Sequence, residues 1–240
     1  LAPGQALEPS LRRFVDAVES ATGRPIYAGR AVGSTIVSNR LETSGWDAVL
    51  LAQFPSRETY DAASLDAARA PFQHSYAQGF IRPASLNVAI PQVLLGVRLV
   101  DLVTLQPSIF PVVRDPGVRA NDANAARFAS LFDALGGNAQ EGIVFVNLQK
   151  NHPEDLKAAA SVHPRKMMRA MAEGGYGPLH TGEAVRLEGD ANFDRIMINW
   201  YSGTDFFLDL ISSRFIQETI DDYQPAEMEA IPTVPILDRL

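Results

Sequence analysis

The chain has 240 residues, of which 46% are hydrophobic, so it can bury a substantial core in one large domain or in two smaller ones. Its formal net charge is -7, from 28 acidic and 21 basic residues. This balance argues against nucleic acid as a partner, because phosphate backbones are bound by clustered Lys and Arg. Cysteine is absent, which excludes disulfides, thiolate nucleophiles and sulfur-ligated zinc. The composition indicates a soluble globular protein and leaves its compartment open, with the cytoplasm as the default.

The first part of the chain predicts two helices and three strands. Apolar periodicity and turn residues place them as helix 9–21, strand 25–37, strand 47–54, helix 56–79 and strand 85–90. A central opening strand is missing from this order, and two sources for it remain open. Either residues upstream of position 1 supply it, or the segment 102–113 does. We favour the first source because Pro107 and Pro111 suit an edge strand better than a central one.

The most apolar run, from Val93 to Leu105, predicts a helix between the two halves of the chain. It is shorter than the ~20 residues that cross a bilayer, so we expect no integral membrane segment here. Arg98 and Asp101 lie three positions apart and are expected to pair on one helix face. This pattern is typical of an amphipathic connector helix that packs on the body of the protein. A loop and a helix over 124–135 follow it.

The second half of the chain predicts the element order βαββαβ. The expected elements are strand 142–150, helix 153–175 with a break near Pro164, strand 179–187, strand 193–201, helix 206–220 and a short strand around Ile231. Ser202 followed by Asp205 predicts a capping box at the start of the second helix. The order is that of a ferredoxin-like unit, an α+β fold with an antiparallel sheet.

Three short matches between the halves indicate a tandem duplication. The aromatic-Asp pair at 46–47 aligns with the pair at 193–194, "PIYAGRAV" from Pro25 aligns with "PLHTGEAV" from Pro178, and "AIP" at 89–91 recurs at 230–232. The offsets drift in small steps, as loop insertions produce, and the order of the elements is unchanged. We therefore expect two ferredoxin-like repeats, residues 1–92 and 141–240, joined by a helical or irregular linker over 93–140.

The stretch "WDAVLLAQFPSRETYDAAS" from Trp46 resembles the strand-turn-helix of DUF1330-like proteins, which has an aromatic-Asp pair, an apolar strand, Phe-Pro-Ser and a helix. The stretches "VFVNLQK" and "FDRIMINWYSGTDFFLDL" resemble a divergent copy of this module, although Pro55-Ser56 becomes Ser202-Gly203 there. The resemblance implies membership of the dimeric α+β barrel superfamily, in which two ferredoxin-like sheets face each other. A tandem copy would build that barrel within one chain. The resemblance implies no catalytic residue, because no reaction is established for these proteins.

No motif with a known catalytic or metal-binding mechanism occurs, so the sequence predicts neither a cofactor nor a metal. Candidate ligand-binding residues are instead polar or aromatic side chains in strands that otherwise look buried: Tyr27, Gln53, Asn147, His180, Asn199 and Tyr201. A buried amide costs about 1–3 kcal/mol if unpaired, so each one needs a partner in the fold, a water or a ligand. Histidine, at positions 74, 152, 163 and 180, is the residue type that titrates near neutral pH.

Two functions from different classes are consistent with these residues. The first is the binding of a small molecule, without catalysis, in an apolar cavity between the two sheets. The second is an enzyme of the barrel superfamily, namely a cofactor-free oxygenase or isomerase, with a haem protein resembling the chlorite dismutase group as the third choice. We expect a monomer if the two halves close on each other and a homodimer if they face outward, and we prefer the monomer.

Strand alternation divides residues 196–201 between two faces. Apolar burial favours the even-numbered residues, such as Ile198, against the helices, which leaves Asn199 and Tyr201 for a face that opens to a ligand. We therefore expect Asn199 to line the main cavity, near His180 or Asn147. An Asn199 that points into the helix layer, with its amide fully bonded to backbone, would exclude this role.

Overall fold

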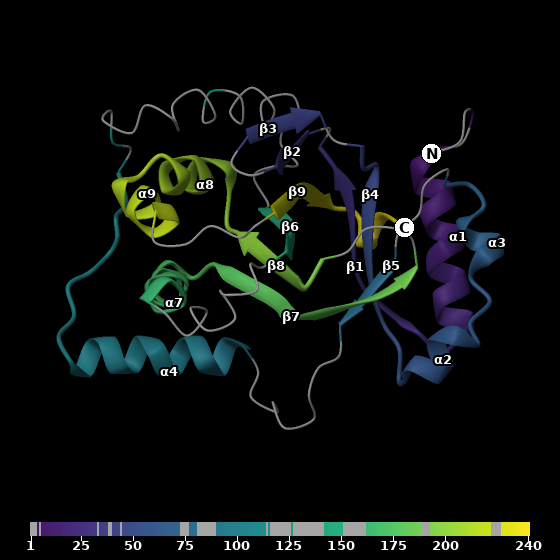
Figure 1. Cartoon of the computed structure of the whole chain (residues 1–240), viewed down its shortest axis with the longest axis horizontal. Coiled ribbons are helices and arrows are strands. Elements are labelled where there is room, and N and C mark those ends of the chain that lie inside the picture. Colours follow the sequence, from purple (N-terminus) through teal and green to yellow (C-terminus); the bar gives the residue numbers. More distant parts are fainter. Residues whose placement is uncertain are drawn as a thin grey trace.

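A computed structural model describes residues 6–32, 34–37, 40–43, 45–72, 77–80, 90–113, 142–150, 162–188, 193–221 and 227–240, together with positions 4, 115 and 126. The first half contains α1 (Leu7–Ser20), β1 (Arg24–Ala31), β2 (Ser34–Val37), β3 (Arg40–Thr43), β4 (Ala48–Gln53), α2 (Arg57–Asp61), α3 (Asp66–Arg69) and β5 (Ala77–Phe80). Helix α4 (Ile90–Val103) follows. The second half contains β6 (Ile143–Lys150), α7 (Val162–Gly174), β7 (Gly177–Glu188), β8 (Arg195–Tyr201), α8 (Thr204–Ile211), α9 (Arg214–Asp221), β9 (Glu227–Pro235) and η2 (Leu237–Arg239). The fold is α+β (Figure 1).

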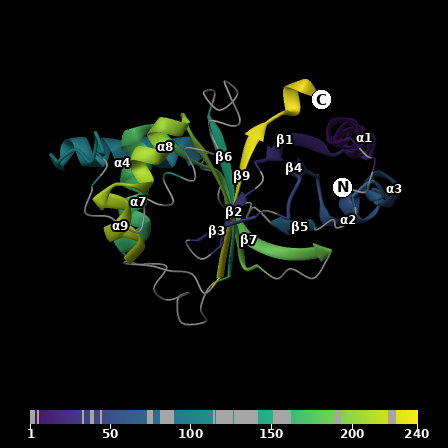
Figure 2. The same ribbon diagram turned by 90° about the horizontal axis from the view of Figure 1, so that it is seen from above.

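The strand pairings in the described part of the chain are antiparallel, and they join both halves into one curled sheet. The strand order is β3-β2-β9-β6-β8-β7-β5, while β1 pairs with β4 and with the end of β9. Strand β9 is the junction, because it pairs with β6 on one edge and with β1 and β2 on the other. Figure 2 shows the strands in the middle, with α1, α2 and α3 on one side and α4, α7, α8 and α9 on the other.

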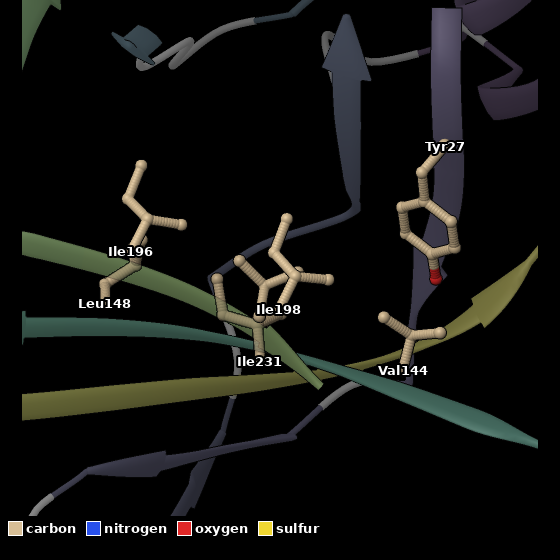
Figure 3. Packing of buried hydrophobic residues seen from close by; sticks show 7 residues of the cluster. Tyr27, Val144, Leu148, Ile196, Ile198 and Ile231 are labelled. Carbon is tan, nitrogen blue, oxygen red and sulfur yellow. The ribbon is translucent and has the colours of Figure 1, made fainter. Parts of the chain in front are cut away.

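Strands β1 and β4 form a first group within the curled sheet, and β6, β8 and β9 form a second group. The two groups bury apolar faces on each other, and we call the layer between them the inner core. Its buried members are Tyr27, Val144, Val146, Leu148, Ile196, Ile198 and Ile231 (Figure 3). Val49 and Leu51 of β4 and Trp200 of β8 pack against it. Because Tyr27, Val49 and Leu51 come from the first half of the chain, the inner core holds the two halves together.

Helices cover the opposite faces of the strands. Helix α1 and η2 pack on the first strand group through Leu11, Val15, Ala28, Ile236 and Leu240. On the second group, helices α7, α8 and α9 enclose a separate cluster that includes Met171, Tyr176 and Leu210. The sheet is therefore covered on both faces, and this arrangement decides where a site can lie.

The long helix predicted over 56–79 is wrong. The chain forms two short helices, α2 and α3, and then strand β5. Ser56 caps α2 by accepting the Thr59 N–H at 3.2 Å. Ser64 has a φ of 47° between the two helices, and this left-handed conformation prevents a continuous helix. The strand predicted over 25–37 is likewise divided into β1 and β2, and residues 40–43 add β3.

The second half follows the predicted order, with β6, β7, β8 and β9 at the expected strand positions. Helix α7 is followed by Gly175 at a φ of 67°, a left-handed conformation that agrees with the helix end predicted at residue 175. The predicted capping box is wrong, because α8 begins at Thr204 without a side-chain cap. The helix predicted over 206–220 is also divided. Ser213 starts its second piece, α9, by accepting the N–H of Ile216 at 3.2 Å.

Two ferredoxin-like repeats are not confirmed by this topology. Strand β2, with β3 beside it, pairs with β9, and β5 pairs with β7. Strands of the first half therefore lie at both edges of the strands that the second half contributes. The segment 102–113 contains the end of α4 and irregular chain, so it supplies no strand. The strand predicted over 85–90 lies outside the described residues except for Ile90, which begins α4, and the helix predicted over 124–135 lies outside them except for position 126. Residues 153–161 of the helix predicted over 153–175 also lie outside them. None of the helices in the described part combines the length and apolar character that a bilayer crossing requires.

Candidate functional site

Six aromatic side chains gather between the sheet and the helices of the second half, and we call them the aromatic cluster. They are Phe110 from the chain after α4, Phe145 from β6, Tyr176 from the α7–β7 turn, Tyr201 from β8, and Phe206 and Phe207 from α8. Three pairs are stacked, namely Phe145 on Phe207 with ring centroids 4.5 Å apart, Tyr176 on Tyr201 at 5.3 Å, and Phe110 on Phe206 at 5.8 Å. Three rings of the cluster are buried and three are partly exposed, so the cluster reaches from the core to the surface.

The backbone around Tyr176 places its ring in this cluster. Gly175 and Gly177 on either side have φ angles of 67° and 132°, in the region that favours glycine. A Cβ at position 177 would meet Met171 Cγ at 2.8 Å, so this position has no room for a side chain either. The two glycines end α7 and direct the intervening tyrosine into the interior, where it is 2% exposed.

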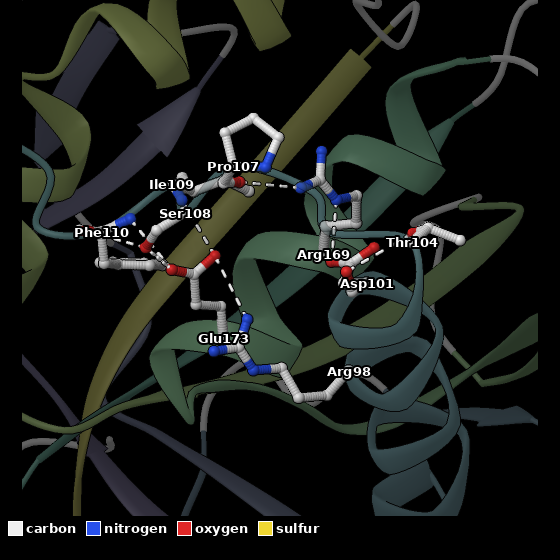
Figure 4. Close-up of polar contacts among 9 residues, drawn as sticks. All are labelled: Arg98, Asp101, Thr104, Pro107, Ser108, Ile109, Phe110, Arg169 and Glu173. Atoms are coloured by element: carbon white, nitrogen blue, oxygen red, sulfur yellow. Dashed lines mark hydrogen bonds and ion pairs between the residues drawn. The ribbon is translucent and has the colours of Figure 1, made fainter.

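Glu173, near the end of α7, holds the chain that carries Phe110 (Figure 4). Its buried carboxylate accepts hydrogen bonds from the Ser108 hydroxyl, the Ile109 N–H at 2.9 Å and the Phe110 N–H at 3.3 Å. Burial raises the pKa of Glu173, but these hydrogen bonds and the nearby Arg98 charge outweigh it and keep the pKa below its usual range. Glu173 therefore fixes where the Phe110 ring enters the aromatic cluster.

Two ion pairs join α4 to α7 beside this carboxylate. Arg98 Nη1 lies 3.7 Å from Glu173 Oε2, and Arg169 Nε donates to Asp101 Oδ2 at 2.8 Å. Arg169 also donates to the Pro107 carbonyl at 3.2 Å. The predicted pairing of Arg98 with Asp101 on α4 is wrong. Helix α7 carries Arg169 and Glu173 four positions apart, on one helix face. Asp101 of α4 pairs with Arg169, and Arg98 of α4 pairs with Glu173.

Two polar atoms at the aromatic cluster have no hydrogen-bond partner. Among the described residues, the buried side-chain oxygens without a partner are Tyr176 Oη, Asn199 Oδ1 and Ser212 Oγ. Tyr176 belongs to the cluster, and Asn199 hydrogen-bonds the cluster member Tyr201. Ser212 lies at the end of α8. An unpaired buried oxygen costs about 1–3 kcal/mol, so the cluster holds hydrogen-bonding capacity that the fold does not use.

Burial keeps the tyrosines of the cluster neutral. Desolvation raises the pKa of Tyr201 to about 12, against a hydrogen bond with Asn199 that lowers it. The pKa of Tyr176 is also raised, first by burial and then by the neighbouring Tyr201. Both hydroxyls therefore stay protonated at physiological pH and act as hydrogen-bond donors rather than bases.

The two faces of β8 are assigned opposite to the prediction. Ile198 lies in the inner core, whereas Tyr201 packs on Phe207 of α8. Asn199 lies directly opposite Phe145, whose ring stacks on Phe207, so Asn199 lies on the helix side. Alternation separates the faces correctly but does not say which layer covers each one. The condition that would exclude Asn199 is met only in part, because its Oδ1 is not bonded to backbone.

The other predicted candidates divide between the same two faces. Asn147 is half-buried opposite Met197 and donates to the Met197 carbonyl at 3.3 Å. Tyr27 lies in the inner core, with its hydroxyl 2.5 Å from Thr233 Oγ1. Thr233 gives its single hydroxyl hydrogen to the Val144 carbonyl at 2.8 Å, so Tyr27 must be the donor to Thr233. Burial raises the pKa of Tyr27 to about 12.

Gln53 and His180 do not join a described site. Gln53 is exposed at the end of β4. His180 lies on β7 opposite Ile198, and its side chain lies outside the described part, as do the side chains of the histidines at 74, 152 and 163. The structure thus brings Asn199 and Tyr201 together on the helix side. It adds Tyr176, which the sequence reasoning missed, although a tyrosine between glycines after a helix was a signal.

A scan of protein-family models, a search of curated proteins and a search of solved structures each found no match to this chain. Within the described ranges, no group of three or more His, Asp or Glu residues is arranged to hold a metal ion. The aromatic cluster with its two unpartnered oxygens is the candidate site, and its chemistry is interpreted from its geometry.

Proposed function

We propose that this chain binds a small aromatic molecule that carries a hydroxyl or amide group, and that the aromatic cluster is the binding site. The observation that carries the proposal is the presence of Tyr176 Oη and Asn199 Oδ1, both buried and unpartnered, beside stacked rings. The Asn199 oxygen accepts a hydrogen bond from such a ligand, and the neutral Tyr176 hydroxyl donates one. A ligand hydroxyl can serve in both roles.

The arrangement of the rings supports the same class of ligand. Phe145 and Tyr176 lie deep in the cluster, whereas Phe110 and Phe206 are partly exposed and stack at 5.8 Å. Phe110 lies on irregular chain rather than in a helix or strand, so its rotation outward would make room between the rings. Each aromatic pair that a flat ligand forms with the remaining rings is worth about 0.5–1.5 kcal/mol beyond burial, which offsets the ring contacts that Phe110 gives up.

We also propose that the chain is a divergent relative of the DUF1330-like proteins, built from two ferredoxin-like units as in the dimeric α+β barrels. The second half supports this with its βαββαβ order and its strand arrangement β9-β6-β8-β7. The meeting of the two apolar strand faces in the inner core supports it as well. In this proposal, the β2–β3 hairpin and β5 are additions to the first unit.

Catalysis without a cofactor, by an isomerase or oxygenase of the same superfamily, is the alternative. The observation that favours it is the neutral, unpartnered Tyr176 hydroxyl in a dry environment, because such a donor stabilises negative charge that develops on a substrate oxygen. A bound carbonyl compound whose ultraviolet spectrum changes over repeated turnovers would favour the enzyme over the binder. A haem protein is the third proposal, and a Soret band in the purified protein would be its signature.

The binding proposal is tested with 2-naphthol and naphthalene, which differ by one hydroxyl group. Titration calorimetry of the full chain should show 2-naphthol binding. Asn199→Leu should weaken it by roughly 5- to 100-fold, as expected for the loss of a buried hydrogen bond worth about 1–3 kcal/mol. Naphthalene binding should not fall in this variant. Equal binding of 2-naphthol to both proteins would contradict the role of Asn199.

Two controls separate the site from other apolar surface. Leu99→Glu changes the exposed side of α4 and should leave 2-naphthol binding at the aromatic cluster unchanged. Circular dichroism should show that Asn199→Leu keeps the wild-type secondary structure. Native mass spectrometry of the freshly purified chain gives a second readout, because a co-purified molecule that 2-naphthol displaces would identify the ligand class directly.

A further inference from the structure

Helix α4 carries a band of exposed apolar side chains that we call the α4 patch. It consists of Val93, Leu95, Leu99, Val100, Leu102 and Val103 on the helix, with Leu105 directly after it. Their exposed fractions range from 41% to 88%. Figures 1 and 2 show α4 at the periphery of the molecule, on the outside of α7. The patch therefore lies on the outer surface of the molecule, outside the inner core.

The charges of α4 point the opposite way. Arg98 and Asp101 are the two charged residues of the helix, and both pair with α7, at Glu173 and Arg169. A surface helix ordinarily buries its apolar stripe and presents its charges to solvent. Here both charges pair with α7, with Asp101 buried and Arg98 38% exposed, while the apolar residues are exposed. An isolated molecule gains nothing from this arrangement, so the α4 patch is suited to contact with another apolar surface.

The spacing within the patch fits a helix as that surface. Leu95, Leu99 and Leu102 are separated by four and then three residues, so they fall within an arc of roughly 60° on a helix of 3.6 residues per turn. Alternating steps of four and three form the seam along which two helices interlock their side chains. Gly96 leaves open space beside this seam, which allows close approach of a partner backbone.

The area of the patch is close to that of a dimer interface. At their observed exposures the seven side chains present on the order of 400 Å² of apolar surface, if a fully exposed Leu or Val contributes ~100 Å². A stable interface buries ~800 Å² per partner, and about 65% of it is apolar in homodimers, which gives ~500 Å². The patch carries no charge, so two copies meet there without repulsion despite a net charge of -7 each.

We propose that two copies of this chain associate through the α4 patch, with α4 packed on α4 across a two-fold axis and Leu99 near its centre. A self-complementary stripe of this kind contacts its own copy as well as any other helix. An anionic membrane surface fits less well, because Arg98 and Arg169 are both held in ion pairs with carboxylates and the chain is acidic. The association uses a surface separate from both the inner core and the aromatic cluster.

Light scattering with size exclusion tests this directly. The full chain at about 50 μM should elute at twice its mass of 26.1 kDa, and Leu99→Glu should elute as a 26.1 kDa monomer with unchanged circular dichroism. Glu19→Leu, on the exposed side of α1, is the matched control and should remain a dimer. A monomeric wild-type chain, or a dimer that persists in Leu99→Glu, would overturn the proposal.

The absence of cysteine allows a second readout. A single Leu99→Cys substitution should give a covalent dimer on mild oxidation, whereas Glu19→Cys should stay monomeric on a denaturing gel. Flotation with vesicles of phosphatidylcholine and phosphatidylglycerol provides the competing outcome. A monomer that floats with these vesicles, and loses this property in Leu99→Glu, would assign the patch to a membrane surface and refute the dimer.

Discussion

The inner core and the helix-side aromatic cluster lie on opposite faces of the same strands, yet their buried tyrosine hydroxyls differ in hydrogen bonding. In the inner core, Tyr27 donates to Thr233, which in turn donates to the Val144 carbonyl. In the aromatic cluster, Tyr176 Oη and Asn199 Oδ1 remain without partners. A face whose polar groups are satisfied contributes cohesion, whereas a face with unused hydrogen-bonding groups retains capacity for a ligand. This difference is the basis on which we attribute stability to the inner core and propose ligand binding at the aromatic cluster.

Substitutions at two neighbouring residues of β8 should give the largest difference in the free energy of unfolding. Ile198→Ala should lower the free energy of unfolding by about 3 kcal/mol, because it removes a fully buried side chain from the inner core. Asn199→Leu should lower it by only about 1 kcal/mol, since the lost oxygen has no partner and only the hydrogen bond with Tyr201 is removed. Urea unfolding of both variants measures the difference. A larger loss in Asn199→Leu than in Ile198→Ala would reverse the assignment of the faces.

The carboxylate that positions Phe110 should give the next largest effect. Glu173→Gln should lower the unfolding free energy at pH 7 by about 2 kcal/mol, because charge-assisted hydrogen bonds to the 108–110 segment become neutral ones. Ser20→Ala, at an exposed position on α1, is a control that should leave stability nearly unchanged.

The effect of Glu173 should depend on pH with a defined sign. Its folded pKa lies below the usual value of 4.5, so the carboxylate contributes stability above pH 4.5, and this contribution is lost as the pH falls through the folded pKa. The gap between the wild type and Glu173→Gln should therefore shrink in acid. A gap that stays constant from pH 7 to pH 3 would show that Glu173 is not held as a carboxylate.

The satisfied phenol should give a smaller but definite effect. Tyr27→Phe should lower the unfolding free energy by about 1 kcal/mol, because it removes the donor to Thr233 while the Thr233 bond to Val144 remains. Thr233→Val should cost more, because it breaks both bonds and leaves the Tyr27 hydroxyl buried without a partner. If the two variants lose the same free energy, the network does not act as a chain of hydrogen bonds.

The sequence predicted the second half of the fold better than the first for a physical reason. Strands β6 and β8 are long and rich in β-branched and aromatic residues, and Gly175 stops α7, so local signals and tertiary structure agree there. In the first half, Ser64 adopts a left-handed conformation that no residue pattern announced, and this conformation divides the predicted helix. The edge strands β3 and β5 are short, with four residues each, and carry too little periodicity to be recognised.

The site was predicted in part. Asn199 and Tyr201 stood out as polar residues in apolar strands, and the structure brings them together at the aromatic cluster. The alternation of side chains along β8 could not show which face meets the helices and which meets the inner core, since both faces of the sheet are buried. The charges of α4 were misread for a related reason. Arg98 and Asp101 look like a solvent-facing pair until α7 supplies Glu173 and Arg169.

The most direct test of the contrast between the two faces is urea unfolding of ligand-free Tyr176→Phe beside Tyr27→Phe. The two substitutions remove the same atom from two buried tyrosines. Tyr176→Phe should leave the unfolding free energy unchanged or raise it by up to about 1 kcal/mol, because an unpartnered hydroxyl is lost, whereas Tyr27→Phe should lower it by about 1 kcal/mol. An equal loss in both variants would show that the Tyr176 hydroxyl is already satisfied by the fold, which contradicts its assignment as a ligand-binding group.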